Sequence, residues 1–312
     1  MPDQPRIGVV GATGAVGTVA LELLRDRGYE NVRAFASERS AGRQLGSLVV
    51  EEATPEVLGQ GDLDLCLFSV GTSGSRELVP PAVAGGAICV DKSGAFRLDD
   101  GVPLVVPEVN GERAFEHDGI VANPNCCSIP LTCALKPLQD AAGLRRVRVA
   151  TYQSVSGAGI EAMERLRAQS TEETDLSADW EFDGEEFDEE AKLRAETRKI
   201  LGLPELPVSA TCFRVPVLIG HTEAVWVETE ELLSPEDARA LLEAAPGIRL
   251  AELPTSGTAA GLDDVLVGRI RADRSTDNGL TFVLACDNLR KGAALNAIQI
   301  AELLLERRPV AV

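Results

Sequence analysis

The first part of the chain alternates short apolar runs with longer stretches of mixed polarity. The apolar runs occupy residues 6–10, 32–36, 63–70 and 87–90. Runs of this length, bounded by turn residues, predict buried strands, and the stretches between them predict helices. Strands that alternate with helices form a parallel, doubly wound sheet, whose ligands bind beyond the carboxyl ends of the strands. The pattern therefore predicts an α/β fold with a Rossmann-like sheet.

The remainder of the chain predicts a second region of mixed elements. Residues 146–152 are predicted as a strand, 211–221 as a strand or extended segment, and 160–169 and 192–201 as helices. Residues 292–305 carry apolar positions at helical spacing, which predicts an amphipathic helix that packs against a sheet. A length of 312 residues corresponds to two domains of ordinary size.

A glycine-rich turn follows the first predicted strand and opens a helix. It reads GATGAVG, with glycines at positions 11, 14 and 17. Such glycines permit a tight turn and let a diphosphate approach the amides at a helix N-terminus. The GxxGxxG spacing is a variant of the stricter dinucleotide fingerprint. The strand before it and the helix after it supply the context that such a motif requires, so we expect a dinucleotide site here.

The segment after the second predicted strand favours NADP over NAD. An acidic residue at this point would bind the ribose 2′-hydroxyl of NAD. The chain instead has Arg39, Ser40 and Arg43, which could hold a 2′-phosphate. Glu38 is evidence in the other direction, because it could take the place of the acidic residue.

Composition describes a soluble globular protein, with 45% hydrophobic and 25% charged residues. No apolar run approaches the roughly 20 residues of a membrane helix, and no signal-peptide core precedes the first strand, so we expect a cytoplasmic protein. A net charge of −19 opposes binding to nucleic acid and to anionic membranes. Seven scattered cysteines and two histidines form no disulfide framework and no metal-binding spacing, so no metal is expected.

The negative charge is concentrated in residues 172–190, where eleven of nineteen residues are acidic and none is Lys or Arg. Such a run is typical of a solvated surface segment, and that interpretation is favoured. A binding site for a specific partner is the alternative.

The segment NPNCCS, residues 123–128, places a cysteine just after a turn and at the head of a helix predicted to run to about Gln139. Unpaired amides and the helix dipole favour a thiolate at such a position, which makes Cys126 a candidate nucleophile. The alternative is a buried cysteine that only packs. For proton transfer the candidates are His221 and His117, and His117 lies in a polar stretch predicted to be an exposed loop.

Taken together, these segments resemble the aspartate-semialdehyde dehydrogenases. The matching blocks occur in the order of that family between residues 7 and 305. They are GATGAVG, ASERSAG, DKSGAFR, VPEVN, NPNC, TYQSVSGAG, ETRKILG, RVPVLIGH and DNLRKGAALNAIQIAE. The resemblance implies reductive dephosphorylation of L-4-aspartyl phosphate by NADPH to L-aspartate 4-semialdehyde, a step in biosynthesis of the aspartate-family amino acids.

The resemblance also implies a role for individual residues. Cys126 would be the nucleophile, His221 the acid and base, and Gln153 the residue that orients substrate and thioester. The implied substrate-binding residues are Arg214 for the α-carboxylate, Arg97 and Lys192 for the phosphate, Glu189 for the α-amino group, and Asn125. The implied cofactor contacts are Gly11, Thr13, Gly14, Ala15, Val16, Arg39, Ser40, Ser156, Gly157 and Asn288.

Chemistry makes the same demands on the site. An acyl phosphate needs a soft nucleophile to displace phosphate, and a thioester then holds the acyl carbon ready for hydride, so cysteine suits both steps. A dianionic substrate approaching a protein of charge −19 needs local cations, which Arg97, Lys192 and Arg214 would supply.

The resemblance implies a discontinuous first domain. Residues 1–125 and 290–312 would bind NADP, and residues 126–289 would form an α+β domain for catalysis and dimerisation, giving a homodimer or a dimer of dimers.

Two departures from the family pattern accompany the resemblance. Cys127 stands where serine is usual, and Ser128 where threonine is usual. The region before Lys192 is shorter than in the family, with residues 180–184 in place of a longer apolar segment, which weakens the assignment of Glu189. Two alternatives stay open: a reductase of another acyl phosphate, such as N-acetylglutamyl phosphate, and a catalytically impaired relative with a binding or regulatory role.

Overall fold

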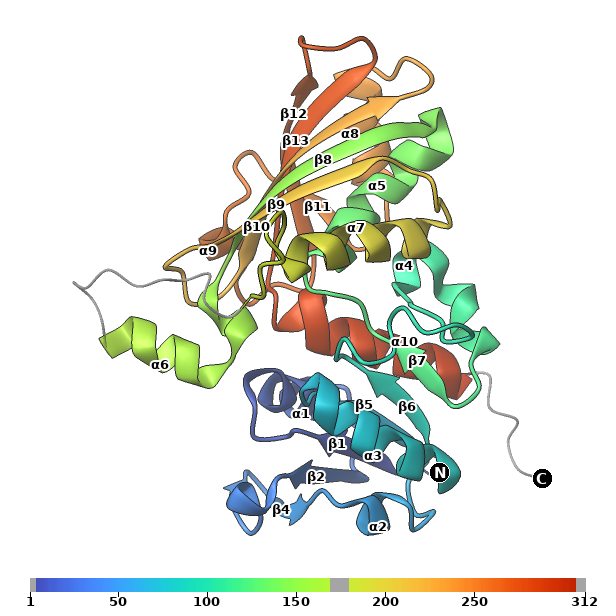
Figure 1. Ribbon diagram of the computed structural model, residues 1–312, viewed down its shortest axis with the longest axis vertical. Helices are drawn as coiled ribbons and strands as arrows, with labels where there is room; N and C mark the ends of the chain where they lie inside the picture. The colour runs from blue at the N-terminus through green and yellow to red at the C-terminus, as the bar shows by residue number, and fades with distance from the viewer. Residues whose placement is uncertain (1–3, 169–179, 307–312) are drawn as a thin grey trace. The chain divides into compact units, whose positions relative to one another are not determined.

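A computed structural model describes residues 4–168 and 180–306 (Figure 1). The chain divides into two compact units. The first comprises Met1–Pro124 and Ala293–Val312, and the second comprises Asn125–Gly292. Each unit is described by itself. In the described ranges, no helix combines the length and the apolar character needed to cross a membrane.

The first unit contains a seven-stranded sheet in the order β3-β4-β2-β1-β5-β6-β7. All neighbouring strands are parallel except the β3–β4 hairpin. The strands are β1 (Ile7–Val10), β2 (Val32–Ala36), β3 (Gln44–Leu45), β4 (Leu48–Glu52), β5 (Leu65–Phe68), β6 (Ile88–Asp91) and β7 (Ile120–Ala122). The four apolar runs of the sequence correspond to β1, β2, β5 and β6, so the predicted parallel sheet is confirmed.

Helices cover both faces of this sheet. On one face, α1 (Ala15–Asp26) and α10 (Leu295–Glu306) contribute Leu23 and Ile298 to a buried cluster. On the other, α2 (Pro55–Leu58) and α3 (Thr72–Ala84) contribute Leu58 and Val79. A short helix, α4 (Pro107–Asn110), lies beside α10 (Figure 1). Two helical layers around a parallel sheet form the doubly wound arrangement.

The glycine-rich turn connects β1 to α1, and two of its glycines are required by its geometry. Gly11 has φ +88°, and a Cβ there would lie 2.3 Å from the carbonyl oxygen of Ser69. A Cβ on Gly17 would lie 2.1 Å from the carbonyl oxygen of Gly11. Real side-chain carbons do not approach backbone that closely, so the turn depends on glycine at both positions.

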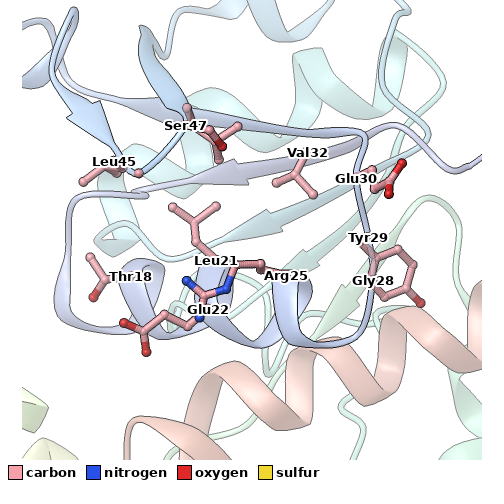
Figure 2. Close-up of a pocket in the computed structure, with 12 residues that line it drawn as sticks. Thr18, Leu21, Glu22, Arg25, Gly28, Tyr29, Glu30, Val32, Leu45 and Ser47 are labelled. Atoms are coloured by element: carbon pink, nitrogen blue, oxygen red, sulfur yellow. The ribbon is translucent and has the colours of Figure 1, made fainter.

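A hollow of about 640 Å³ lies between α1 and the β3–β4 hairpin (Figure 2). Leu21, Val32 and Leu45 form apolar parts of its lining, and Glu22 and Arg25 form polar parts. None of the residues that the sequence assigns to a site lines this hollow.

The second unit contains a six-stranded mixed sheet in the order β11-β12-β13-β10-β8-β9. Its strands are β8 (Leu144–Gln153), β9 (Val208–Arg214), β10 (His221–Thr229), β11 (Ile248–Leu250), β12 (Val265–Ala272) and β13 (Gly279–Cys286). Three helices contact strands of this sheet: α5 (Ser128–Ala142), α7 (Asp188–Leu201) and α8 (Pro235–Ala244). The short α9 (Ser256–Ala259) also contacts β13, and α6 (Ile160–Ala168) contacts the turn Val155–Ala158.

Residues alternate between the two faces of this sheet. On β10, His221, Glu223 and Val225 are buried, and the residues between them are partly exposed. On the opposite face, Tyr152 and Phe213 are 42% and 49% exposed and stack with ring centroids 6.2 Å apart. The sheet therefore has one face buried within its unit and one face that exposes aromatic side chains.

Two sequence predictions need correction in this unit. The predicted extended segment 211–221 is two strands, because β9 ends at Arg214 and β10 begins at His221. The end of the acidic run is not solvated, because Glu189 and Glu190 are buried in the first turn of α7. Glu190 accepts hydrogen bonds from the backbone N–H groups of Phe187 and Cys212. Residues 172–179 of the acidic run lie outside the described residues.

Candidate active site

A thiol and an imidazole face each other in the second unit. Cys126 lies in the turn that leads into α5, and His221 is the first residue of β10. Cys126 Sγ lies 3.2 Å from His221 Nε2. Cys126 is half-buried, whereas His221 is fully buried. An imidazole within hydrogen-bond distance of a partly accessible thiol is the arrangement of an activated cysteine nucleophile.

The backbone determines which nitrogen of His221 carries the proton. The N–H of Ser154 donates to His221 Nδ1 at 3.0 Å, and the Ser154 hydroxyl lies 3.2 Å from the same atom. Because Nδ1 accepts from an amide, the neutral ring carries its proton on Nε2. That proton points at Cys126 Sγ, so the neutral ring stabilises a thiolate by donating a hydrogen bond. Sequence reasoning missed Ser154, although it lies inside the matched block TYQSVSGAG.

Two amide side chains converge on one buried carboxyl group beside the thiol. Asn125 Nδ2 and Gln153 Nε2 each donate to Glu189 Oε1 at 2.9 Å. Burial raises the pKa of Glu189, and the charge of Cys126 adds to the rise, whereas the two hydrogen bonds and the charge of Lys192 oppose it. The structure thus brings Glu189 next to Gln153 and Asn125 despite the shorter segment before α7.

The turn that presents Cys126 is held by hydrogen bonds to its own backbone. The side-chain oxygen of Asn125 accepts from the N–H of Cys127 at 2.8 Å. The N–H of Asn125 donates to Glu196 Oε2 on α7 at 2.6 Å. Glu196 is 2% exposed and sequence reasoning missed it. An acidic residue within a helical pattern is normally assigned to the surface, so nothing in the local pattern identified its role.

The guanidinium of Arg214 lies close to the same centre. Arg214 Nη1 donates to the carbonyl oxygen of Ser154 at 3.0 Å, and its guanidinium carbon lies 4.6 Å from the centre of the Trp180 ring. A Cβ on Gly157 would lie 2.9 Å from Arg214 Nη1 and 3.7 Å from His221 Nε2. Glycine at position 157 therefore leaves room beside both side chains. Trp180 belongs to the segment that departs from the family pattern, and its position over Arg214 was not predicted.

Three further candidates occupy defined positions in this unit. Lys192 forms an ion pair with Asp188 one helical turn earlier. Asn288 Nδ2 donates to the Ser156 hydroxyl at 2.8 Å, and its Oδ1 accepts from the N–H of Gly220 at 2.8 Å. These bonds connect the loop after β8 to the residue before His221. Asn288 therefore has a structural role in the site that does not depend on a cofactor, because it holds these two segments together.

The second thiol of the pair is in a different environment. Cys127 is fully buried, whereas Cys126 is half-buried. Burial raises the pKa of the Cys127 thiol well above its ordinary value, and contact with Cys126 adds to the rise. A thiol of this kind is a poor nucleophile at neutral pH.

The remaining candidates belong to the first unit. Arg97 is 8% exposed and donates to the carbonyl oxygens of Asn123 at 3.0 Å and Lys92 at 2.5 Å. Thr13 Oγ1 lies 3.4 Å from Ser40 Oγ, which places the glycine-rich turn beside the end of β2, and Arg39 is exposed there. Gly14, Ala15 and Val16 form the start of α1, with Gly14 as its N-cap.

His117 is also in the first unit and is half-buried, contrary to the predicted exposed loop. Its Nδ1 accepts from the N–H of Gly119 at 2.9 Å, and burial lowers its pKa.

These observations define a two-domain α/β protein with a glycine turn suited to a dinucleotide and a cysteine–histidine pair in a separate mixed sheet. Two family models match the chain. A semialdehyde dehydrogenase NAD-binding domain matches residues 6–117, and a semialdehyde dehydrogenase dimerisation domain matches residues 135–181 and 178–291. The class is therefore that of the semialdehyde dehydrogenases, which combine a nicotinamide-binding domain with a dimerisation domain.

Individual relatives specify the family further. The aspartate-semialdehyde dehydrogenase of Corynebacterium melassecola is 44% identical over 343 aligned residues, which cover 96% of this chain and 99% of the relative. The crystal structure of Vibrio cholerae aspartate semialdehyde dehydrogenase II complexed with ASA is 39% identical. It matches with a TM-score of 0.93 over 98% of this chain and 100% of the other.

A more distant structure carries a cofactor. The Candida albicans aspartate semialdehyde dehydrogenase with NADP is 27% identical, with a TM-score of 0.77 over 97% of this chain and 99% of the other. With two family models and full-length relatives in agreement, the chain belongs to the aspartate-semialdehyde dehydrogenase family.

Proposed function

We propose that this protein catalyses the NADPH-dependent reductive dephosphorylation of L-4-aspartyl phosphate to L-aspartate 4-semialdehyde and phosphate. The observation that carries the proposal is the Cys126–His221 pair at 3.2 Å, with Gln153, Glu189 and Arg214 assembled around it. A chain that had lost catalysis would have no chemical reason to keep these five side chains together.

Cys126 performs the covalent steps in this proposal. Its sulfur attacks the acyl carbon of the substrate, a C–S bond forms, and phosphate leaves with the electron pair of the broken C–O bond. A bound nicotinamide supplies the hydride that reduces the resulting thioester. The C–S bond then breaks and its electron pair returns to sulfur, which regenerates the thiolate. The Nε2 proton of His221 points at this sulfur and stabilises the thiolate at the beginning and the end of the cycle.

Separate charged groups bind the two ends of the substrate. Arg214 binds the α-carboxylate, because a guanidinium offers paired donors to a carboxylate and its Nη1 already lies within the loop that orients His221. Glu189 binds the α-amino group, for which an ionised carboxylate is the complementary partner. Lys192 and Arg97 bind the phosphate. Gln153 and Asn125, both hydrogen-bonded to Glu189, orient the substrate and the thioester.

The first unit binds the cofactor, and we propose that this is NADP. The glycine-rich turn of residues 11–17 binds the diphosphate. Its contacts come from Gly11, Thr13, Gly14, Ala15 and Val16 at the helix N-terminus, where backbone N–H groups donate to phosphate oxygens. Arg39 and Ser40, beyond the end of β2, hold the 2′-phosphate. From the second unit Ser156, Gly157 and Asn288 complete the contacts.

The second unit also forms the interface of a homodimer. The face of its sheet that is not buried within the unit exposes Tyr152 and Phe213. Stacked aromatic rings on a sheet face suit burial against a second copy of this chain. We further propose a cytoplasmic location, because the seven cysteines, all within the described residues, are thiols that are not joined in disulfides, which suits a reducing compartment.

An assay in the reverse direction tests the proposal. Purified protein is mixed with L-aspartate 4-semialdehyde, phosphate and NADP, and NADPH absorbance is followed. We expect sustained NADPH formation that requires all three compounds. Turnover of N-acetylglutamate semialdehyde, with none of aspartate semialdehyde, would instead assign the protein to another acyl phosphate. No turnover with either would favour a catalytically impaired relative.

A further inference from the structure

A buried carboxyl group that the mechanism above does not use lies beside the nucleophile. Glu223 is the third residue of β10, two positions after His221, so both side chains project from the same face of the sheet. In the strand register Glu223 lies opposite Thr151 on β8 and Leu284 on β13. Its exposed fraction is 0%.

Among the described residues, neither carboxyl oxygen of Glu223 has a hydrogen-bond partner. Thiols interact with it electrostatically. The charge of Cys126 raises the pKa of Glu223, and the charge of Glu223 raises the pKa of Cys286 on β13 and of Cys212 on β9. Buried polar groups in folded proteins nearly always have a partner, so a carboxyl without one requires an explanation.

Glu189 provides an internal comparison. It is also buried beside Cys126, but it accepts two amide hydrogen bonds and feels the charge of Lys192. The two hydrogen bonds and the charge of Lys192 favour an ionised carboxylate and oppose the effect of burial on the pKa of Glu189. For Glu223 burial raises the pKa and the negative charge of Cys126 adds to the rise, and the nearby thiol of Cys127, which is outside hydrogen-bond geometry, does not offset them.

The environment of Glu223 favours its protonated form. An unpaired carboxylate in a dry interior costs several kcal/mol, and such a group normally takes up a proton instead. Burial raises the pKa of Glu223 well above its ordinary value, and the negative charge of Cys126 adds to the rise. Two negative charges in one buried site disfavour each other, so a thiolate on Cys126 keeps Glu223 neutral.

We propose that Glu223 is a positioning residue that holds a proton in step with the charge of Cys126. While Cys126 is a thiolate, Glu223 is neutral. When sulfur forms the C–S bond its charge is lost, and Glu223 releases its proton to solvent. When the C–S bond breaks and the electron pair returns to sulfur, Glu223 takes a proton back. The thiol and the carboxyl together thus carry one negative charge throughout, and no net proton is consumed. The catalytic part of this cycle rests on the proposed function.

Infrared spectroscopy of the resting protein tests the proposal without turnover. A protonated carboxyl has a carbonyl stretch that is separate from the amide and carboxylate bands. We expect this band in the wild-type protein at neutral pH, its loss in Glu223→Gln, and its retention in Glu189→Gln. Glu228→Gln is the matched control, because Glu228 lies on the same strand but pairs with Arg146 and Arg148. It should keep the band.

Coupling to Cys126 is tested by removing the charge of sulfur. Methyl methanethiosulfonate converts the thiolate of Cys126 to a neutral methyl disulfide and releases methanesulfinate, and it introduces no carbonyl. The pH midpoint at which the Glu223 band disappears should fall by about one unit or more after this treatment, and in Cys126→Ser. Dithiothreitol should reverse the shift in the treated wild type.

Two results would overturn the proposal. The first is a wild-type protein without the Glu223 band at neutral pH. The second is a Glu223 band whose pH midpoint stays unchanged both after formation of the methyl disulfide and in Cys126→Ser. If Glu223→Gln does not fold, the difference spectrum of Glu189→Gln before and after methyl methanethiosulfonate decides the question. Because no substrate is used, failure here leaves the assay of aspartate semialdehyde as an independent test of the proposed function.

Discussion

The two sheets of this protein serve function in different ways. In the first unit the important groups are backbone atoms, because the glycine turn between β1 and α1 offers amides and bare Cα atoms to the cofactor diphosphate that we propose to bind there. In the second unit they are side chains, since Cys126, His221 and Glu189 come from a turn, a strand and a helix. A site built from backbone depends on the space that glycine leaves. A site built from side chains depends on the identity of each residue.

The largest effect is expected at the nucleophile. Cys126→Ala removes the proposed nucleophile that forms the thioester, so turnover should fall by about four orders of magnitude or more. Steady-state NADPH formation from aspartate semialdehyde measures the loss, and the cofactor affinity serves as a control that should not change. An active Cys126→Ala enzyme would contradict the mechanism.

The glycine turn should be sensitive to a single methyl group. In Gly17→Ala the new Cβ would lie 2.1 Å from the Gly11 carbonyl oxygen, so the turn must move. We expect a loss of about 3 kcal/mol in unfolding free energy and at least about tenfold weaker NADP binding. Thermal unfolding and a fluorescence titration measure both.

Gly71→Ala is the matched control for the turn. A Cβ there meets nothing within 4 Å, and its φ of −67° suits any residue. It should cost no more than about 1 kcal/mol as a changed N-cap. Equal losses in the two variants would show that close approach of backbone does not determine the turn.

Removal of a cation that binds the substrate should weaken binding of one end of the substrate and leave the other end unaffected. Lys192→Ala should raise the KM for phosphate in the reverse reaction by about thirtyfold, because a charge-assisted contact is lost. Arg97→Ala should act in the same way, and Arg214→Ala should raise the KM for the semialdehyde instead. Lys136→Ala, which removes a half-buried Lys paired with Asp140, is the control. An unchanged phosphate KM in Lys192→Ala would reject its role.

Arg39 in the first unit should favour NADP over NAD. Arg39→Ala should raise the KM for NADP by about tenfold and leave the kinetics with NAD nearly unchanged, because only NADP has a 2′-phosphate. Equal losses with both cofactors would reject this contact.

The smallest effect is expected one residue away from the nucleophile. Cys127→Ser should keep turnover within about threefold of wild type, because Cys127 is buried and its raised pKa keeps it protonated. Steady-state kinetics at several pH values measure this. A loss comparable to that of Cys126→Ala would show that the two thiols act together.

Sequence patterns predicted four of the seven strands of the first unit and its glycine turn, because buried parallel strands and glycine turns are local signals, and did not identify β3, β4 and β7. β1, β2, β5 and β6 occur where apolar runs occur. The second unit was predicted less well. The segment between Arg214 and His221 ends in Gly220, which has a φ of +93° and where a Cβ would lie 2.4 Å from the carbonyl oxygen of Ser256, a neighbour that only tertiary structure brings close. The carboxyls of Glu189, Glu196 and Glu223 appear as surface residues in a local pattern, and only packing shows that all three are buried.

The central claim is that Cys126 carries the acyl group. The most direct measurement mixes the protein with aspartate semialdehyde and NADP in the absence of phosphate, so that the thioester cannot be released to phosphate. We predict a single burst of NADPH stoichiometric with the chain. Peptide mass mapping should then find the aspartyl group on Cys126 and none on Cys127. An adduct on Cys127, or a burst that persists in Cys126→Ala, would contradict the account.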